Sequence, residues 1–316
     1  MTDGTTYTIN VAVSDVAGNS ATDTGDTFVY DKTAPTSTTA VLAVGGDGNG
    51  NNGDAVTMTL DPSETVATPT CTFTSDGDAM AGTVTYSTSN PDSHIASITV
   101  ANGDSDGTVA FSCTYSDLAG NAIGTAITSA SSGSVTIDNT HPSISSVAAS
   151  WGAYLNAAED NSDGTITVIT SGAADGQTVT ITGMGVTDTC SVSSNTCTAT
   201  IAAADLQGLT DGTTYTITVN VDDAAGNSAT PDTGDTFIYD KTNPSISNVV
   251  ADWGAYLNAV EDNSDGTITV TTVGVADGLT VTVTGMGVTD TCSVSTNSCT
   301  ATIAAADLQG LTDGTT

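Results

Sequence analysis

The chain has 316 residues, 36 of them acidic against two Lys or Arg, which gives a formal net charge of −34. This charge excludes nucleic-acid binding and a polybasic membrane anchor, because both need clustered Lys and Arg, and it attracts cations instead. Plentiful Thr and Val with only 4% aromatic residues favour strands around small cores, and no run of 18 apolar residues is present to span a membrane.

Two short motifs recur along the chain and divide it into units. The turn motif, Asp-x-x-Gly-Asn, stands at residues 15–19, 117–121 and 223–227. The linker motif, Asp-x-Thr-x-Pro, stands at residues 31–35, 138–142 and 240–244. A proline after an extended segment marks the end of a strand and a linker. The sequence therefore predicts the last part of a domain in residues 1–34, a divergent domain in 35–139, a further domain in 140–241, and the first part of another in 242–316.

The two incomplete units match the complete one. Residues 138–209 recur as 240–311, and residues 2–31 recur as 210–240. One interpretation is that the chain is a slice of a longer product made of the same repeats, which also explains the absence of a signal peptide at Met1. The other is that the tail of one molecule is completed by the head of the next, which gives a filament by strand donation.

Alternating apolar and polar residues predict the strands of one repeat. Tyr215, Ile217, Val219 and Val221 alternate with polar residues, as in a half-buried strand. Residues 187–192 and 196–201 are expected to form a hairpin. The full set of strands is expected at 143–149, 165–170, 178–183, 187–192, 196–201, 215–221 and 236–239. Seven short strands in roughly 100 residues, separated by Gly, Asp and Asn turns, predict an all-β fold of tandem immunoglobulin-like Greek-key sandwiches.

A resemblance to a known family rests on the repeated strings. Asp-Gly-Thr-Thr-Tyr at 211–215, followed by Asp-Ala-Ala-Gly-Asn and Tyr-Asp-Lys-Thr-x-Pro, resembles the bacterial Ig-like repeats of giant secreted adhesins, and Leu-Asn-Ala-Ala-Glu at 155–159 fits the same family. The resemblance is close outside residues 35–139. It implies an extracellular, often calcium-rigidified rod that holds a binding domain away from the cell. Residues 209–215 also resemble the tyrosine corner of such sandwiches, which Tyr7 keeps.

Oxygen-rich loops predict Ca²⁺ at the domain joints. Residues 47–54 place oxygen donors among glycines as at the start of an EF-hand loop. Sandwich topology is expected to bring Asp47 and Asp54 near Asp138, and Glu159 and Asp163 near Asp240, where clustered carboxylates repel unless a cation bridges them. The alternative is that these are solvated turn residues. The candidate ligands are Asp47, Asn49, Asn51, Asp54, Asp138, Glu159, Asp163, Asp175, Asp223, Asp240 and Glu261.

The six cysteines predict three disulfides and hence an oxidising compartment. Cys190 and Cys197 flank a tight turn and are expected to face each other across the predicted hairpin. Cys292 and Cys299 repeat this arrangement. Cys71 and Cys113 are expected to join neighbouring strands. The spacing does not suit a zinc site.

The sequence indicates a structural protein and not an enzyme. His141 is replaced by Ala34 and Asn243 in the sister linkers, and no nucleophile, metalloprotease or phosphate-binding motif is present. The predicted function is a stalk or spacer of an extracellular adhesin, stiffened by Ca²⁺ at its joints and bound to neighbouring repeats. One alternative is a glycan- or protein-binding module, with Trp151 and Trp253 either stacking on sugar or capping the sandwich. Another is the self-assembling surface filament.

Overall fold

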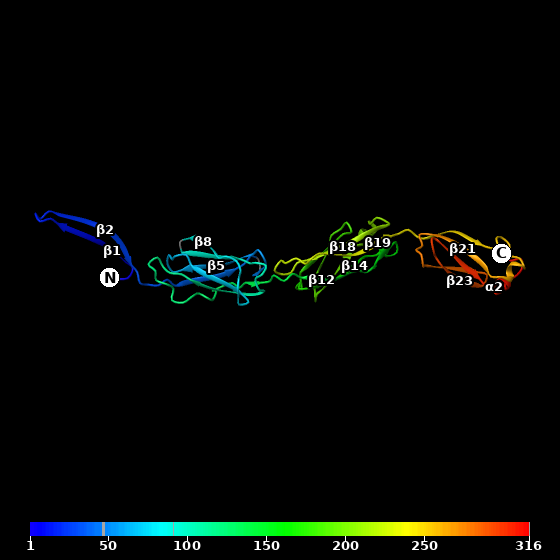
Figure 1. Ribbon diagram of the computed structural model, residues 1–316, viewed down its shortest axis with the longest axis horizontal. Helices are drawn as coiled ribbons and strands as arrows, with labels where there is room; N and C mark the ends of the chain where they lie inside the picture. The colour runs from blue at the N-terminus through cyan, green and yellow to red at the C-terminus, as the bar shows by residue number, and fades with distance from the viewer. Residues whose placement is uncertain (46–47, 91, 316) are drawn as a thin grey trace. The chain divides into compact units, whose positions relative to one another are not determined.

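The computed structural model describes residues 1–45, 48–90 and 92–315 (Figure 1). The described residues form β-strands, two short α-helices, α1 (Ala203–Gln207) and α2 (Ala305–Gln309), and two single-turn 3-10 helices, η1 (Glu159–Asn161) and η2 (Glu261–Asn263). In the described part of the chain, no helix has the length and apolarity needed to cross a membrane. The strands form tandem immunoglobulin-like sandwiches, which confirms the predicted fold class.

The chain divides into two compact units. One contains residues 1–152, 162–206 and 215–236, and the other contains residues 153–161, 207–214 and 237–316. The predicted domain boundaries at residues 34, 139 and 241 stay a prediction.

Residues 1–34 form a two-stranded ribbon (Figure 1). Its strands β1 (Thr5–Ser14) and β2 (Ser20–Tyr30) pair antiparallel, with a bulge after Thr8. The backbone N–H of Thr2 donates to the Tyr7 hydroxyl oxygen at 2.5 Å, which is the bond expected of a tyrosine corner. Apolar side chains alternate along β1, yet they are exposed in this ribbon.

Residues 35–139 form two facing sheets, ordered β3-β5-β9-β8 and β4-β11-β10-β6-β7. Between them lies a core that includes Met58, Leu60, Phe73, Ile98 and Phe111. Their strands are β3 (Ser37–Ala43), β4 (Asn49–Gly50), β5 (Ala55–Pro62), β6 (Thr70–Ser75), β7 (Asp78–Ala79), β8 (Thr85–Asn90), β9 (Ser93–Thr99), β10 (Gly107–Thr114) and β11 (Thr136–Ile137).

Residues 140–241 repeat this plan with sheets β12-β14-β17 and β13-β19-β18-β15-β16. Ile217, Val219 and Val221 are buried as their alternation predicts. Strand β13 runs parallel to β19 and pairs with it from Tyr154↔Ile238 to Asn156↔Asp240. The strands are β12 (Ser143–Ala149), β13 (Tyr154–Asn156), β14 (Gly164–Ser171), β15 (Thr178–Thr182), β16 (Asp188–Ser191), β17 (Thr196–Ile201), β18 (Thr213–Val221) and β19 (Asp232–Asp240).

The predicted hairpin of residues 187–192 and 196–201 is wrong. Strand β16 pairs with β15, and β17 pairs with β14, so the two consecutive strands belong to different sheets. Only a bridge between Ser193 and Thr196 remains of the hairpin. Strand β17 instead pairs along its whole length with a long central strand, which satisfies more backbone groups than a short hairpin could.

Residues 242–315 contain sheets β20-β21-β24 and β22-β23. Their core includes Ile268, Val270, Ala301, Ile303 and Leu308. The strands are β20 (Ser245–Ala251), β21 (Gly266–Val273), β22 (Thr280–Gly285), β23 (Val288–Ser293) and β24 (Ser298–Ile303). They repeat β12, β14, β15, β16 and β17, and residues at matching places in the repeated sequence are called counterparts below.

Candidate functional site

Each linker motif is held by an aspartate that lies earlier in the chain. The Asp3 carboxylate accepts hydrogen bonds from the Lys32 N–H (2.6 Å) and the Thr33 hydroxyl (2.5 Å). The first Asp of the linker also accepts the N–H of the Thr two residues on. The same set of bonds recurs with Asp106 and Asp138 around Thr140, and with Asp211 and Asp240 around Thr242.

The turn motif folds in the same way in its three copies. In the last copy, the Asp223 carboxylate accepts the backbone N–H groups of Ala225 and Asn227 and the Asn227 side-chain amide, each at 2.9 Å. Gly226 has φ 88°, a conformation that favours glycine. Asp15 binds Asn19, and Asp117 binds Asn121, through the same backbone and side-chain bonds.

In two copies the turn motif also binds the linker that precedes its unit. The Asn121 side-chain amide donates to the Asp31 carbonyl oxygen at 3.2 Å. The Asn227 amide donates to the Asp138 carbonyl oxygen at 2.8 Å. These two meeting points are called the first joint and the second joint. At the second joint, the Asn51 amide also donates to the Ala225 carbonyl oxygen at 2.8 Å.

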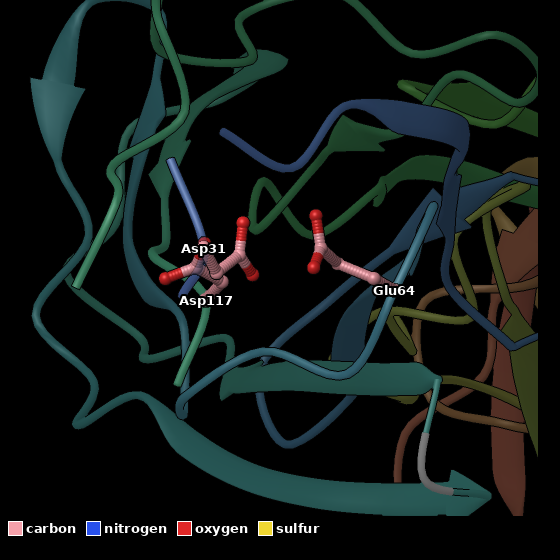
Figure 2. Close-up of side chains that lie close together, drawn as sticks. All are labelled: Asp31, Glu64 and Asp117. Carbon is pink, nitrogen blue, oxygen red and sulfur yellow. The ribbon is translucent and has the colours of Figure 1, made fainter. Parts of the chain in front are cut away.

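Three carboxylates converge at the first joint, as Figure 2 shows: those of Asp31, Glu64 and Asp117. Their oxygens lie within 4.8 Å of one another. Asp31 comes from the linker, Glu64 from the loop after β5, and Asp117 from the turn motif after β10. An open pocket of ≈ 430 Å³ is lined by this acidic triad together with Val29, Thr65, Leu118 and Ala119. Within residues 1–45, 48–90 and 92–315, no other group of three His, Cys, Asp or Glu side chains lies so close together.

The triad is electrostatically unfavourable on its own. Partial desolvation and then the negative charges of Asp31, Asp117 and Asp3 raise the pKa of Glu64. For Asp117, desolvation also acts to raise the pKa, but hydrogen bonds from the side chain and backbone of Asn121 outweigh it and leave the pKa lowered. The repulsion among the three carboxylates therefore acts mainly on Glu64, and a bound cation would reduce this repulsion.

The spacing of the triad suits a calcium ion. Ca²⁺ takes six to eight oxygens at 2.3–2.6 Å, so two oxygens on one ion lie at most about 5 Å apart. Three carboxylates offer up to six oxygens, and carbonyl groups or water would supply the rest. Figure 2 shows the Glu64 carboxylate facing those of Asp31 and Asp117, which leaves the space between them as the place for an ion.

Several predicted ligands fix local turns. Asp47 lies outside the described residues. The Asp54 carboxylate accepts the Asn51 N–H at 3.0 Å, and Asn49 begins the preceding strand β4. Asp163 accepts the N–H of Ala203 at the start of α1, and Asp175 accepts the N–H of Ser194, at 2.9 and 2.7 Å.

The remaining predicted ligands lie near linkers or turns. Glu159 accepts the N–H of Asn156, which pairs with Asp240 across β13 and β19. Glu261 makes the counterpart bond to Asn258. Asp138 and Asp223 meet through Asn227. Calcium binding at this whole set of residues stays a prediction.

The predicted set missed the triad. Asp31 and Asp117 are the first residues of the linker and turn motifs, so the repeat pattern itself marked two of its three members. Glu64 belongs to no repeated motif. The strand register makes Gly172 its counterpart, because Thr39 pairs with Asp61 just as Ser146 pairs with Ile169. The second joint thus lacks the third carboxylate.

The cysteines form the three expected pairs. Cys71 on β6 and Cys113 on β10 are direct partners in neighbouring strands, with Cα atoms 4.1 Å apart. Cys190 and Cys197 are 5.7 Å apart between Cα atoms, and Cys292 and Cys299 are 5.6 Å apart. Since β16 and β17 lie in different sheets, the Cys190–Cys197 bridge joins the two sheets of its sandwich.

Trp151 packs inside its sandwich. It is 7% exposed, and its ring lies against Gly164, where an added Cβ would come within 2.4 Å. The ring is therefore not available to stack on a sugar. Trp253 contacts Gly266 in the same way.

No family model matches this chain, and no curated protein matches it. Among solved structures, it is similar to a Ca²⁺-stabilized adhesin that helps an Antarctic bacterium reach out and bind ice, with 23% identity over 98% of this chain and 75% of that one and a TM-score of 0.42. It is also similar to part of a 1.5-MDa bacterial ice-binding adhesin, with 25% identity, coverage of 85% and 87%, and a TM-score of 0.37. An I-band fragment of titin shows 12% identity, coverage of 86% and 89%, and a TM-score of 0.42.

Proposed function

We propose that this chain is a spacer segment of an extracellular adhesin stalk, and that Ca²⁺ stiffens its first joint by binding Asp31, Glu64 and Asp117. The observation that carries the proposal is the convergence of these three carboxylates where a linker meets the sandwich that follows it. Disulfides suit an oxidising, extracellular setting. Repeated joints built from the same linker and turn motifs suit a protein whose task is spacing.

The proposed mechanism is a bridge between the linker and the sandwich. Asp31 belongs to the linker, whereas Glu64 and Asp117 belong to loops of the following sandwich. An ion held by all three would tie the linker to two loops and remove its freedom to bend. The second joint has Gly172 in place of Glu64. There the Asn227 amide binds the linker at the Asp138 carbonyl, and the Asn51 amide binds the turn motif at the Ala225 carbonyl. We therefore expect calcium to act at the first joint and to leave the second unchanged.

The test is a calcium titration of the full chain by isothermal calorimetry, with Glu64→Gln as the variant. Gln keeps the size of the side chain but lacks its charge, so binding should be lost. Glu159→Gln is the matched control, because it removes the same charge from a loop outside the triad, where Glu159 accepts the Asn156 N–H. If calcium acts at the first joint, this variant should bind it as the wild type does. Equal calcium binding by both variants would show that the triad is not the calcium site.

Thermal unfolding gives a second measurement. A ligand that binds only the folded state stabilises it by mass action, by about 2.7 kcal/mol at a hundredfold excess over its dissociation constant. The melting temperature of the first unfolding transition should therefore be higher in calcium than in EGTA for the wild type and for Glu159→Gln. For Glu64→Gln it should be the same in both. Magnesium at the same ionic strength controls for screening. A melting curve indifferent to calcium would contradict the calcium site and leave the spacer proposal, which small-angle scattering of the full chain would test separately.

A further inference from the structure

We propose that the second joint is held by a hydrogen-bonded latch that works without a metal ion, and that Asp106 and Asn51 are its positioning residues. The joint lies between the sandwich of residues 35–139 and that of residues 140–241, and its residues belong to one compact unit. The inference rests on the proposed spacer function, in which the joints set the stiffness of the segment. It does not depend on the calcium site.

The first set of contacts ties the linker to the preceding sandwich. Asp106, in the loop between β9 and β10, accepts the Asn139 N–H and the Thr140 hydroxyl, each at 2.5 Å. The Asn139 side-chain amide donates to the carbonyl oxygens of Ala101 at 3.2 Å and Asp104 at 3.0 Å. The other two linkers have a lysine at this place. The asparagine therefore gives the second joint two side-chain bonds to the preceding sandwich.

The second set of contacts ties the linker to the sandwich that follows. Besides the bond from the turn motif, the His141 Nδ1 atom lies 2.8 Å from the Ser228 carbonyl oxygen. A carbonyl oxygen only accepts, so Nδ1 is the protonated nitrogen of this imidazole. Pro142 lies against Gly172, where an added Cβ would come within 3.2 Å of the proline Cα. The glycine that replaces the third carboxylate of the first joint thus lets the linker approach closely.

The third contact joins the two sandwiches directly. Asn51 follows β4 in the first sandwich, and its side-chain amide donates to the Ala225 carbonyl oxygen in the turn motif of the second at 2.8 Å. The Asp54 carboxylate accepts the backbone N–H of the same asparagine and fixes its position. An added Cβ at Gly226 would lie 3.4 Å from the Asn51 amide nitrogen, so a glycine leaves room for the contact. Bending at the linker must break this bond.

These contacts need no cation, because each one pairs a donor with an acceptor of the chain itself. The donors are the amides of Asn51, Asn139 and Asn227 and the imidazole of His141. Among the described residues, three carboxylates converge within 4.8 Å of one another at the first joint alone. The repulsion that a cation would reduce there has no equivalent of this kind at the second joint. The latch should therefore hold in EGTA.

The test measures the distance across the joint by pulsed electron paramagnetic resonance of the full chain. Spin labels go on Ser87→Cys in β8 and Thr198→Cys in β17, both exposed positions. The wild type should give one narrow distance distribution, the same in calcium and in EGTA. Asp106→Ala and Asn51→Ala should each broaden it in EGTA. Amide exchange at Asn139 should also be about fivefold faster in Asp106→Ala, because its N–H loses its acceptor.

Two matched controls separate the latch from local effects. Asp211→Ala removes a carboxylate that makes the same pair of bonds at the third linker, and Asn52→Ala changes the exposed neighbour of Asn51. Both should keep the narrow distribution. Thr140→Val should broaden it, because valine lacks the hydroxyl that Asp106 accepts, whereas Thr140→Ser keeps a hydroxyl and should restore the wild-type distribution.

Three results would overturn the latch. The first is a wild-type distribution that is broader in EGTA than in calcium. The second is a distribution in Asp106→Ala and Asn51→Ala that matches the controls. The third is an effect of Asn51→Ala in calcium alone, which would make Asn51 a calcium ligand instead. Glu64→Gln should leave the distribution across the second joint unchanged, so failure of the calcium site and failure of the latch are seen in different measurements.

Discussion

The side-chain amide of Asn227 donates a hydrogen bond of 2.8 Å to the backbone carbonyl of Asp138. The same amide binds the Asp223 carboxylate, so one buried side chain joins a turn to the preceding linker. Asn121 and Asp31 repeat the relationship at the first joint. The turn motif is therefore more than a tight turn, because its last residue supplies the contact that fixes the linker.

Asn227→Ala should loosen the second joint. The substitution leaves the Asp138 carbonyl and one Asp223 oxygen without their donor, which costs about 1–3 kcal/mol when the groups are buried. Hydrogen–deuterium exchange around Thr140 should accelerate. Asn19→Ala is the control, because Asn19 makes the same bonds to its own Asp in an exposed turn. It should cost less, and an equal loss in both variants would assign the effect to the turn alone.

Without calcium, stability should fall as the pH rises through the titration of Glu64. The pKa of Glu64 in the folded chain is raised above its ordinary value of 4.5. Between these two pKa values the folded state binds more protons than the unfolded state, so the free energy of unfolding decreases with rising pH. The effect is reduced by solvent screening. Other carboxyls with lowered pKa, such as Asp117, contribute the opposite slope. The difference in unfolding free energy between wild type and Glu64→Gln, measured in EGTA at several pH values, should therefore decrease as the pH rises through the Glu64 titration.

The two kinds of disulfide should differ in their contribution to stability. By the loop-entropy model, the Cys71–Cys113 bridge closes a loop with a sequence separation of 42 and contributes about 4 kcal/mol, whereas the Cys190–Cys197 bridge, with a separation of 7, contributes about 2.5 kcal/mol. Denaturant unfolding of the two double-alanine variants would measure this order. A larger loss for Cys190→Ala/Cys197→Ala would mean that joining the two sheets matters more than chain entropy.

Gly164→Ala should disturb the Trp151 pocket. The added Cβ would lie 2.4 Å from the indole ring, so the ring must move, and overpacking of this kind costs about 1–3 kcal/mol. Tryptophan fluorescence should shift, and the melting temperature should fall. Gly103→Ala is the control, since nothing lies within 4 Å of its added Cβ. Unchanged stability in Gly164→Ala would show that the pocket can adapt.

Strand positions followed from the sequence, but strand partners did not. The alternation of residues 196–201 marks β17 with no offset, because a period of two reports burial of one face. The same residues, Tyr-Leu-Asn, form β13 at 154–156 and no strand at 256–258. Within the described residues, the first copy pairs with the neighbouring strand β19, and residues 256–258 pair with no strand. Partner choice is tertiary, and it also explains why the predicted hairpin at Ser193 was wrong.

The sequence predicted where the candidate site lies better than it predicted which residues form it. The motifs placed acidic groups where linkers meet turns, and Asp31 and Asp117 lie there. Glu64 could not be found this way, because its counterpart is Gly172 and no repeat marks it. Asp163 and Asp175 accept nearby backbone N–H groups, as Asp residues in turns commonly do, and their role as calcium ligands stays a prediction.

The parallel pairing of β13 with β19 has a mechanical consequence. Tension applied through the two linkers pulls β13 toward its N-terminus and β19 toward its C-terminus. For parallel neighbours these pulls oppose each other along the strand axis, so the pair is loaded in shear, and the bonds from Tyr154↔Ile238 to Asn156↔Asp240 share the load. Bonds that must rupture together resist force better than bonds that open one after another. The pair β4–β11 is also parallel, so both sandwiches contain a strand pair that is loaded in shear when the chain is stretched.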